Sequence, residues 1–207
     1  MALAHRLLTM SKANRKQEIL QALAQMLEAT PGGKITTASL AKEVGVSEAA
    51  LYRHFPSKAR MIEGLIEFAE ETLFSRIGTI LSDHEDAATR CHNILFLLLT
   101  FVERNPGFAR LFVGDALQGE TERLRARMCQ LLDRIETQMR QCMREERALQ
   151  QFGDVGISAK ANLLLASAEG QILQFVRSDF RQLPTAHWKD QWALLAGSIF
   201  VSQPASN

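Results

Sequence analysis

The 207-residue sequence has few of the features that mark secreted, membrane or zinc-binding proteins. Its three cysteines, Cys91, Cys129 and Cys142, include no C-x-x-C pair, which argues against a disulfide framework or a four-thiolate zinc site. The longest apolar run, residues 94–102, is about half of the roughly 20 residues that a membrane helix needs. The N-terminus shows no secretory signal. We therefore expect a cytoplasmic protein without a membrane segment.

The sequence motifs of common enzyme classes are absent as well. The chain contains no G-x-S-x-G elbow, no H-E-x-x-H pair, no Walker loop and no dinucleotide fingerprint, so we expect neither an enzyme nor a cofactor. His84, Cys91 and His92 lie close together in sequence, but their offsets scatter them around a helix. We therefore expect no metal site there.

The charges are unevenly distributed, although the net charge is only +1. Residues 1–60 hold nine basic and four acidic residues, whereas the remainder holds 15 basic and 19 acidic residues. This asymmetry indicates that the N-terminal segment contacts a polyanion and that the acidic body has another role. Chance clustering on a solvated surface is the alternative.

Apolar residues recur at helical spacing throughout the chain, and no run alternates strictly between apolar and polar residues, so we expect an all-α fold. We expect an N-terminal domain over residues 1–56, which comprises an N-terminal arm and three helices. A helical dimerisation and regulatory domain is expected over residues 57–207. The expected helices are residues 14–29, 36–44, 47–55, 57–82, 86–105, 108–113, 120–149, 158–178 and 188–201.

The segment 36–55 has the layout of a helix-turn-helix. The small Ala41 fits where two helices cross, Gly45 permits a left-handed turn, and Val46 fills the corner. Leu51 and Phe55, four residues apart, mark the buried face of the second helix. The opposite face is polar, as expected for a helix that enters the major groove of DNA.

We expect eight residues of this segment and its continuation to contact DNA. Arg53 is the candidate for reading guanine, because its guanidinium can pair with two guanine acceptors, and Ala49 can pack on a thymine methyl group. The others are candidates for the phosphate backbone or for close approach at a helix start. The full set is Thr36, Thr37, Ser47, Ala49, Tyr52, Arg53, His54 and Lys58.

At these residues the sequence resembles the DNA-binding domain of tetracycline-repressor-type (TetR) regulators. The resemblance covers about the first 60 residues and includes Thr36-Thr37, Leu40-Ala41, Gly45-Val46-Ser47, Leu51-Tyr52, His54-Phe55 and Lys58. It implies an all-helical, two-domain subunit that dimerises through its last two long helices and binds a near-palindromic site in double-stranded DNA.

A resemblance to the nucleoid occlusion subfamily of these regulators extends over most of the chain. It rests on residues 45–61, 65–68, 103–107 and 175–180. It implies a DNA-bound dimer, associated with the nucleoid, that captures the cell-division GTPase FtsZ. It also implies a capture groove between helices 57–82 and 86–105, with Phe68, Arg76 and Arg104 at the matching positions. Without the resemblance, Phe68 is a half-buried side chain and both arginines are solvated.

Other interpretations of the body remain open at this point. A ligand-responsive repressor would bind a small molecule in a roomy apolar pocket, and a purely structural protein would bind no DNA. Trp188 and Trp192 fit a dimer seam or the wall of such a pocket. We also expect the charged face of helix 120–149 to be solvated, with i,i+4 ion pairs. The cysteines are expected to be buried small apolar residues rather than sensors, with oxidation of Cys142 on the charged helix as the alternative.

Overall fold

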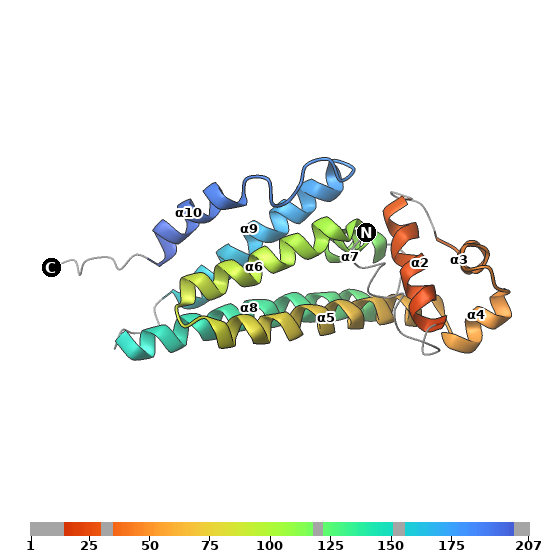
Figure 1. The fold of residues 1–207 in the computed structure, drawn as a ribbon, viewed down its shortest axis with the longest axis horizontal. Helices are drawn as coiled ribbons and strands as arrows, with labels where there is room; N and C mark the ends of the chain where they lie inside the picture. Colours follow the sequence, from red (N-terminus) through yellow and green to blue (C-terminus); the bar gives the residue numbers. More distant parts are fainter. Residues whose placement is uncertain (1–14, 30–34, 118–121, 151–155, 201–207) are drawn as a thin grey trace. The chain divides into compact units, whose positions relative to one another are not determined.

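The structure, a computed structural model, describes residues 15–29, 35–117, 122–150 and 156–200. Within these ranges the regular elements are helices joined by turns, so the all-α prediction is confirmed (Figure 1). The expected N-terminal arm lies outside the described residues. The elements are α2 (Arg15–Ala29), α3 (Thr37–Val44), α4 (Glu48–His54), α5 (Lys58–Asp83), α6 (Ala87–Arg104), α7 (Pro106–Phe112), η1 (Asp115–Leu117), α8 (Glu122–Gln150), α9 (Ile157–Arg177) and α10 (Trp188–Ile199).

The chain divides into two compact units. The first comprises residues 1–72 and 101–130, and the second comprises residues 73–100 and 131–207. The first unit therefore contains α2, α3, α4, α7 and the N-terminal part of α5, whereas α9 and α10 belong to the second. The division of function at residues 56 and 57 stays a prediction.

The helices α3 and α4 begin and end where their capping residues predict. Thr36 caps α3 in a reciprocal pair with Ser39, because each side chain accepts a hydrogen bond from the other's main-chain nitrogen. Gly45 ends α3 with φ +73° and ψ +36°, a left-handed conformation that most residues avoid. Ser47 then caps α4 by accepting a hydrogen bond from the main-chain nitrogen of Ala50. Val46 at the corner is half-buried rather than fully enclosed.

In the first unit, two carboxylates of α5 are buried and pair with arginines of α8. Glu63 accepts hydrogen bonds from Arg60 and Arg123, and Glu70 accepts one from Arg127 at 2.6 Å. Burial tends to raise the pKa of Glu63, but the two guanidinium groups hold that pKa below its ordinary value. The predicted solvated face holds for Arg123, which is 66% exposed, but the prediction missed that Arg123 and Arg127 pair with carboxylates about 60 residues earlier in the chain.

The second unit has an apolar core formed by α6, α8 and α9. Its members are fully or nearly fully buried and include Ile94, Leu95, Leu98, Leu131, Ile135, Met139, Leu164, Ile172 and Phe175. Trp188 is 2% exposed and stacks on His92 of α6 with ring centroids 6.3 Å apart. The single chain therefore already buries this tryptophan without a second subunit.

Two of the three cysteines are buried, as expected for small apolar residues. Cys142 is 2% exposed and is hydrogen-bonded to Cys91, which is fully buried, whereas Cys129 on α8 is exposed. The hydrogen bond with Cys142 and burial both raise the pKa of the Cys91 thiol. Cys142 lies in the buried stripe of α8 with Met139 and Met143, so the alternative that oxidants reach it was wrong.

Candidate nucleic-acid interface

The surface of α3 and α4 is the candidate interface with DNA. Leu40, Ala41 and Leu51 are buried and anchor the two helices to the rest of the first unit. The main-chain nitrogen of Val46 donates to the oxygen of Ala41 at 2.9 Å, which tightens the turn between the two helices. This arrangement leaves the polar face of α4 in solvent.

The eight predicted DNA contacts all lie on α3, α4 or the residues that cap and follow them. Five of them are exposed and three are half-buried. Tyr52 is 44% exposed, which is high for an aromatic side chain that has no role in the core. The exposed residues are Thr36, Ser47, Ala49, Tyr52 and Arg53, and the half-buried ones are Thr37, His54 and Lys58.

A hydrogen-bond network joins α3 to α4 across this surface. The Tyr52 hydroxyl donates to Oγ1 of Thr37 at 3.2 Å, and the Thr37 hydroxyl donates to Oε2 of Glu48 at 2.9 Å. The network fixes the directions of both hydroxyl groups before any ligand arrives. Glu48 had no predicted role, although an acid in the first turn of a helix within a basic segment was the available signal.

The base of the interface is also held together by a cation–π contact. Nζ of Lys16 on α2 lies 5.7 Å from the ring centroid of Phe55, the residue that ends α4. The hydroxyl of Ser57 accepts a hydrogen bond from the main-chain nitrogen of Arg60 and thereby caps α5. This cap fixes the start of α5 at Lys58, one of the predicted DNA contacts.

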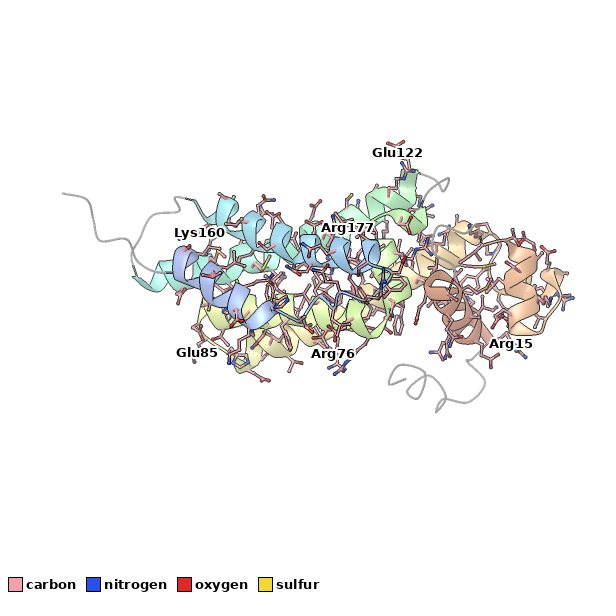
Figure 2. The ribbon with its side chains drawn as sticks, turned by 90° about the horizontal axis from the view of Figure 1, so that it is seen from above. Arg15, Arg76, Glu85, Glu122, Lys160 and Arg177 are labelled. Atoms are coloured by element: carbon pink, nitrogen blue, oxygen red, sulfur yellow. The ribbon has the colours of Figure 1, made fainter. Side chains whose placement is uncertain are left out.

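The three predicted partner-binding residues are found in different compact units. Phe68 is half-buried, and its ring centroid lies 6.0 Å from that of Phe108 in the first unit. Arg104 is exposed at the end of α6, in the same unit. Arg76 belongs to the second unit, where its side chain points outward from α5 (Figure 2). A groove formed by all three residues stays a prediction.

No metal or membrane site emerges from the described residues. Within the described ranges, no three histidine, cysteine or acidic side chains are grouped so as to hold a metal ion. No helix in the described part of the chain is long and apolar enough to span a membrane.

Comparison with known proteins agrees with this geometry. Residues 19–65 match the model for bacterial regulatory proteins of the tetR family. Residues 85–199 match an SlmA-like model described as a tetracyclin repressor-like C-terminal domain. The chain is 57% identical over 192 residues to the nucleoid occlusion factor SlmA of Shewanella baltica (strain OS155), which covers 92% of this chain and 98% of the relative.

This chain belongs to the SlmA family of TetR-type DNA-binding regulators. A second SlmA, from Shewanella sp. (strain W3-18-1), is also 57% identical over 192 residues, with 92% of this chain and 98% of that relative covered. These proteins are named as regulators and occlusion factors, so the chain is not an enzyme.

Solved structures share the fold at much lower identity. The fatty acid degradation regulator FadR from Bacillus halodurans has a TM-score of 0.74 at 16% identity, covering 87% of this chain and 97% of that chain. The TetR family regulator PfmR from Thermus thermophilus has a TM-score of 0.70 at 22% identity, covering 90% of this chain and 99% of that chain. Both likenesses concern the fold alone.

Proposed function

We propose that this protein is a nucleoid occlusion factor. As a homodimer it binds a near-palindromic site in chromosomal DNA, and while on DNA it captures FtsZ and blocks division-ring assembly over the chromosome. It acts in the cytoplasm, on the nucleoid. The observation that carries the proposal is the 57% identity to SlmA, because it extends over both the DNA-binding segment and the body.

The exposed polar face of α4 supports the DNA-binding part. A seven-residue helix that buries Leu51 and leaves Tyr52 and Arg53 in solvent presents aromatic and cationic groups to a ligand. Arg53 can pair with guanine in the major groove. A ligand surface without hydrogen-bond acceptors would leave this guanidinium without a partner.

An apolar stripe on α9 supports the dimer. Leu163 and Leu173 are 51% and 52% exposed, and Ala166 and Gly170 lie between them on the same side of the helix. Small residues between two leucines allow another helix to approach closely. On α10, Leu194 is 75% exposed. Exposed apolar side chains of this size favour burial against a second copy.

The partner-binding part rests on Phe68, Arg76 and Arg104. Both arginines are exposed, and an acidic, partly apolar peptide tail can pair its charges with them while its apolar groups pack on an aromatic ring. Because the two arginines are solvated, reversing either charge is expected to leave the folding of the chain intact.

The test combines a DNA titration with an FtsZ assembly assay. A duplex selected by the protein from a randomised pool is titrated by fluorescence anisotropy, and FtsZ polymers with GTP are then pelleted with and without the protein–duplex complex. We expect the complex to reduce the pelleted FtsZ. Arg76→Glu and Arg104→Glu should lose this effect and keep their affinity for DNA, whereas Arg125→Glu, at an exposed arginine of α8, should keep both.

Each contrary outcome removes a defined part of the proposal. Retained FtsZ capture in both variants removes the proposed groove. No effect of the unaltered complex on FtsZ removes the division role and leaves a DNA-binding regulator. For the ligand-responsive repressor, no specific observation in the described residues speaks in its favour.

A further inference from the structure

Glu48 is an acidic residue on the face of α4 that is proposed to meet DNA. It is the first residue of α4, directly after the cap Ser47, and its side chain is exposed. Its Oε2 accepts the hydrogen bond from Thr37, and Thr37 in turn accepts one from Tyr52. Among the described residues, no group donates a hydrogen bond to Oε1, so one carboxylate oxygen is held in place while the other faces solvent.

Electrostatics oppose a carboxylate at this position unless DNA compensates for it. The N-terminal residues of a recognition helix are the ones that reach base edges, and every phosphate nearby is negatively charged. A glutamate there lowers affinity for DNA in general. The loss is offset only where a base offers a hydrogen-bond donor to the carboxylate.

The major groove offers two such donors, the N4 amino group of cytosine and the N6 amino group of adenine. In an A·T pair the amino group lies between two acceptors that repel a carboxylate, N7 of adenine and O4 of thymine, whereas the cytosine amino group has an acceptor, O6 of guanine, on one side only. Cytosine is therefore the better partner for an anchored carboxylate.

We infer that Glu48 is a specificity-determining residue that reads cytosine in the major groove through its carboxylate, and that Thr37 and Tyr52 hold the carboxylate in the reading position. The inference rests on the DNA binding proposed above. It assigns a base contact to the start of α4, in addition to the one expected of Arg53.

A purely structural role for Glu48 makes a different prediction. An acid in the first turn of a helix interacts favourably with the helix dipole, and removing it lowers stability slightly without regard to DNA sequence. A cytosine reader instead changes the preference at one base pair in each half-site. The sequence preference, rather than affinity or stability, therefore separates the two roles.

The experiment uses the full chain with Glu48→Ala, Glu48→Gln and a control, Glu43→Gln, at an exposed acid of α3. Each protein selects duplexes from a randomised pool. Four versions of the selected duplex, one for each base pair at the position where cytosine is expected, are then titrated with the protein. We expect the unaltered protein to prefer cytosine about five- to tenfold at one position per half-site. Glu48→Ala should lose the preference at that position alone, and Glu43→Gln should keep it.

A chemical probe tests the amino group directly. Replacing the cytosine by 2-pyrimidinone, which lacks the 4-amino group, should weaken binding of the unaltered protein and of Glu43→Gln. It should change the binding of Glu48→Ala little. The loss of affinity of Glu48→Gln on this duplex should be smaller than that of the unaltered protein and larger than that of Glu48→Ala, since its amide oxygen still accepts a hydrogen bond but carries no charge.

Unchanged base preference in Glu48→Ala, with its helicity and melting temperature retained, overturns the inference and leaves DNA binding in place. A preference of the unaltered protein for adenine at the Glu48-dependent position overturns the assignment to cytosine. If the unaltered protein selects no sequence, the proposed function itself fails, and the inference fails with it.

Discussion

The guanidinium of Arg110 donates a hydrogen bond to the main-chain oxygen of Leu27 at 2.7 Å, although the two residues are 83 positions apart. The same guanidinium donates through Nε to Asp115 at 2.6 Å, and Arg110 as a whole is only 2% exposed. Leu27 lies in the last turn of α2, where main-chain oxygens lack helical partners. A buried arginine of α7 therefore closes the end of the first helix of the DNA-binding segment.

We predict that Arg110→Met lowers the free energy of unfolding by about 2–3 kcal/mol, since it removes two charge-assisted hydrogen bonds and leaves a buried oxygen without a donor. Urea denaturation followed by circular dichroism measures the loss. Arg15→Met removes an exposed ion pair with Glu18 and should change stability by less than about 1 kcal/mol. Equal effects of the two substitutions would contradict the role of Arg110.

We predict that Gly107→Ala is destabilising because α7 and α2 pack too closely for a methyl group. A Cβ atom at Gly107 would lie 2.2 Å from the main-chain oxygen of Ala24, so the helices must separate. We expect a loss of about 1–3 kcal/mol. Gly78→Ala is the matched control, since nothing lies within 4 Å of its Cβ position in α5, and it should raise stability by about 0.5–1 kcal/mol. A neutral Gly107→Ala would refute the close approach.

We predict that Arg53→Ala and Lys58→Ala weaken DNA binding in different ways. Loss of a guanine-reading arginine should lower affinity for the selected duplex by about 1–3 kcal/mol and relax the base preference at one position. Loss of a phosphate-binding lysine should weaken all duplexes alike and reduce the dependence on salt. Anisotropy titrations on selected and scrambled duplexes at two salt concentrations measure both effects. Identical losses on both duplexes from Arg53→Ala would remove its reading role.

We predict that Glu63 contributes to stability at neutral pH and loses that contribution in acid. Because its pKa is lowered in the folded state, the contribution is complete above the ordinary value of 4.5 and disappears as the pH falls through the folded pKa. Glu63→Gln should therefore be less stable than the unaltered protein by about 1 kcal/mol at pH 7, with the difference shrinking below about pH 4.5. Urea denaturation between pH 3 and 7 measures it, with Glu67→Gln as the exposed control on the same helix.

We predict that ionised Glu169 lowers stability at neutral pH, whereas ionised Glu63 raises it. Glu169 is an exposed residue, but its carboxylate is partly desolvated; this desolvation and the carboxylates of Glu136 and Asp133 raise the pKa of Glu169, so its ionisation opposes folding. The penalty appears as the pH rises above the ordinary value of 4.5 and is complete above the folded pKa. Glu169→Gln should melt at a higher temperature than the unaltered protein at pH 7 and at the same temperature in acid. A lower melting temperature at pH 7 would contradict this environment.

Helix boundaries in the DNA-binding segment were predictable because capping acts over three or four residues. Thr36 and Ser47 bond to main-chain nitrogens of their own first turns, and Gly45 adopts a conformation that its missing side chain permits. The buried stripe of α4 followed from the four-residue spacing of Leu51 and Phe55. These features depend on neighbours in sequence, so the sequence alone was sufficient.

Partners distant in sequence were not predictable in the same way. The arginines of α8 fit a solvated face by their spacing, but Arg123 and Arg127 bind carboxylates of α5. The burial of Cys142 against Cys91 and the contact of Glu48 with Thr37 also join different helices. Spacing within one helix indicates which side is apolar but not which residue of another helix faces it.

The amino-acid sequence by itself determined that the chain is helical, where the DNA-binding helices begin and end, and which family the chain resembles, because propensity, capping and motif spacing are properties of adjacent residues. Only the tertiary structure decided which charges are buried, which arginine closes α2 and which hydroxyl group binds the carboxylate of Glu48. Those outcomes depend on packing between helices, where a hydrogen bond or an ion pair forms only if two distant segments meet at the right distance.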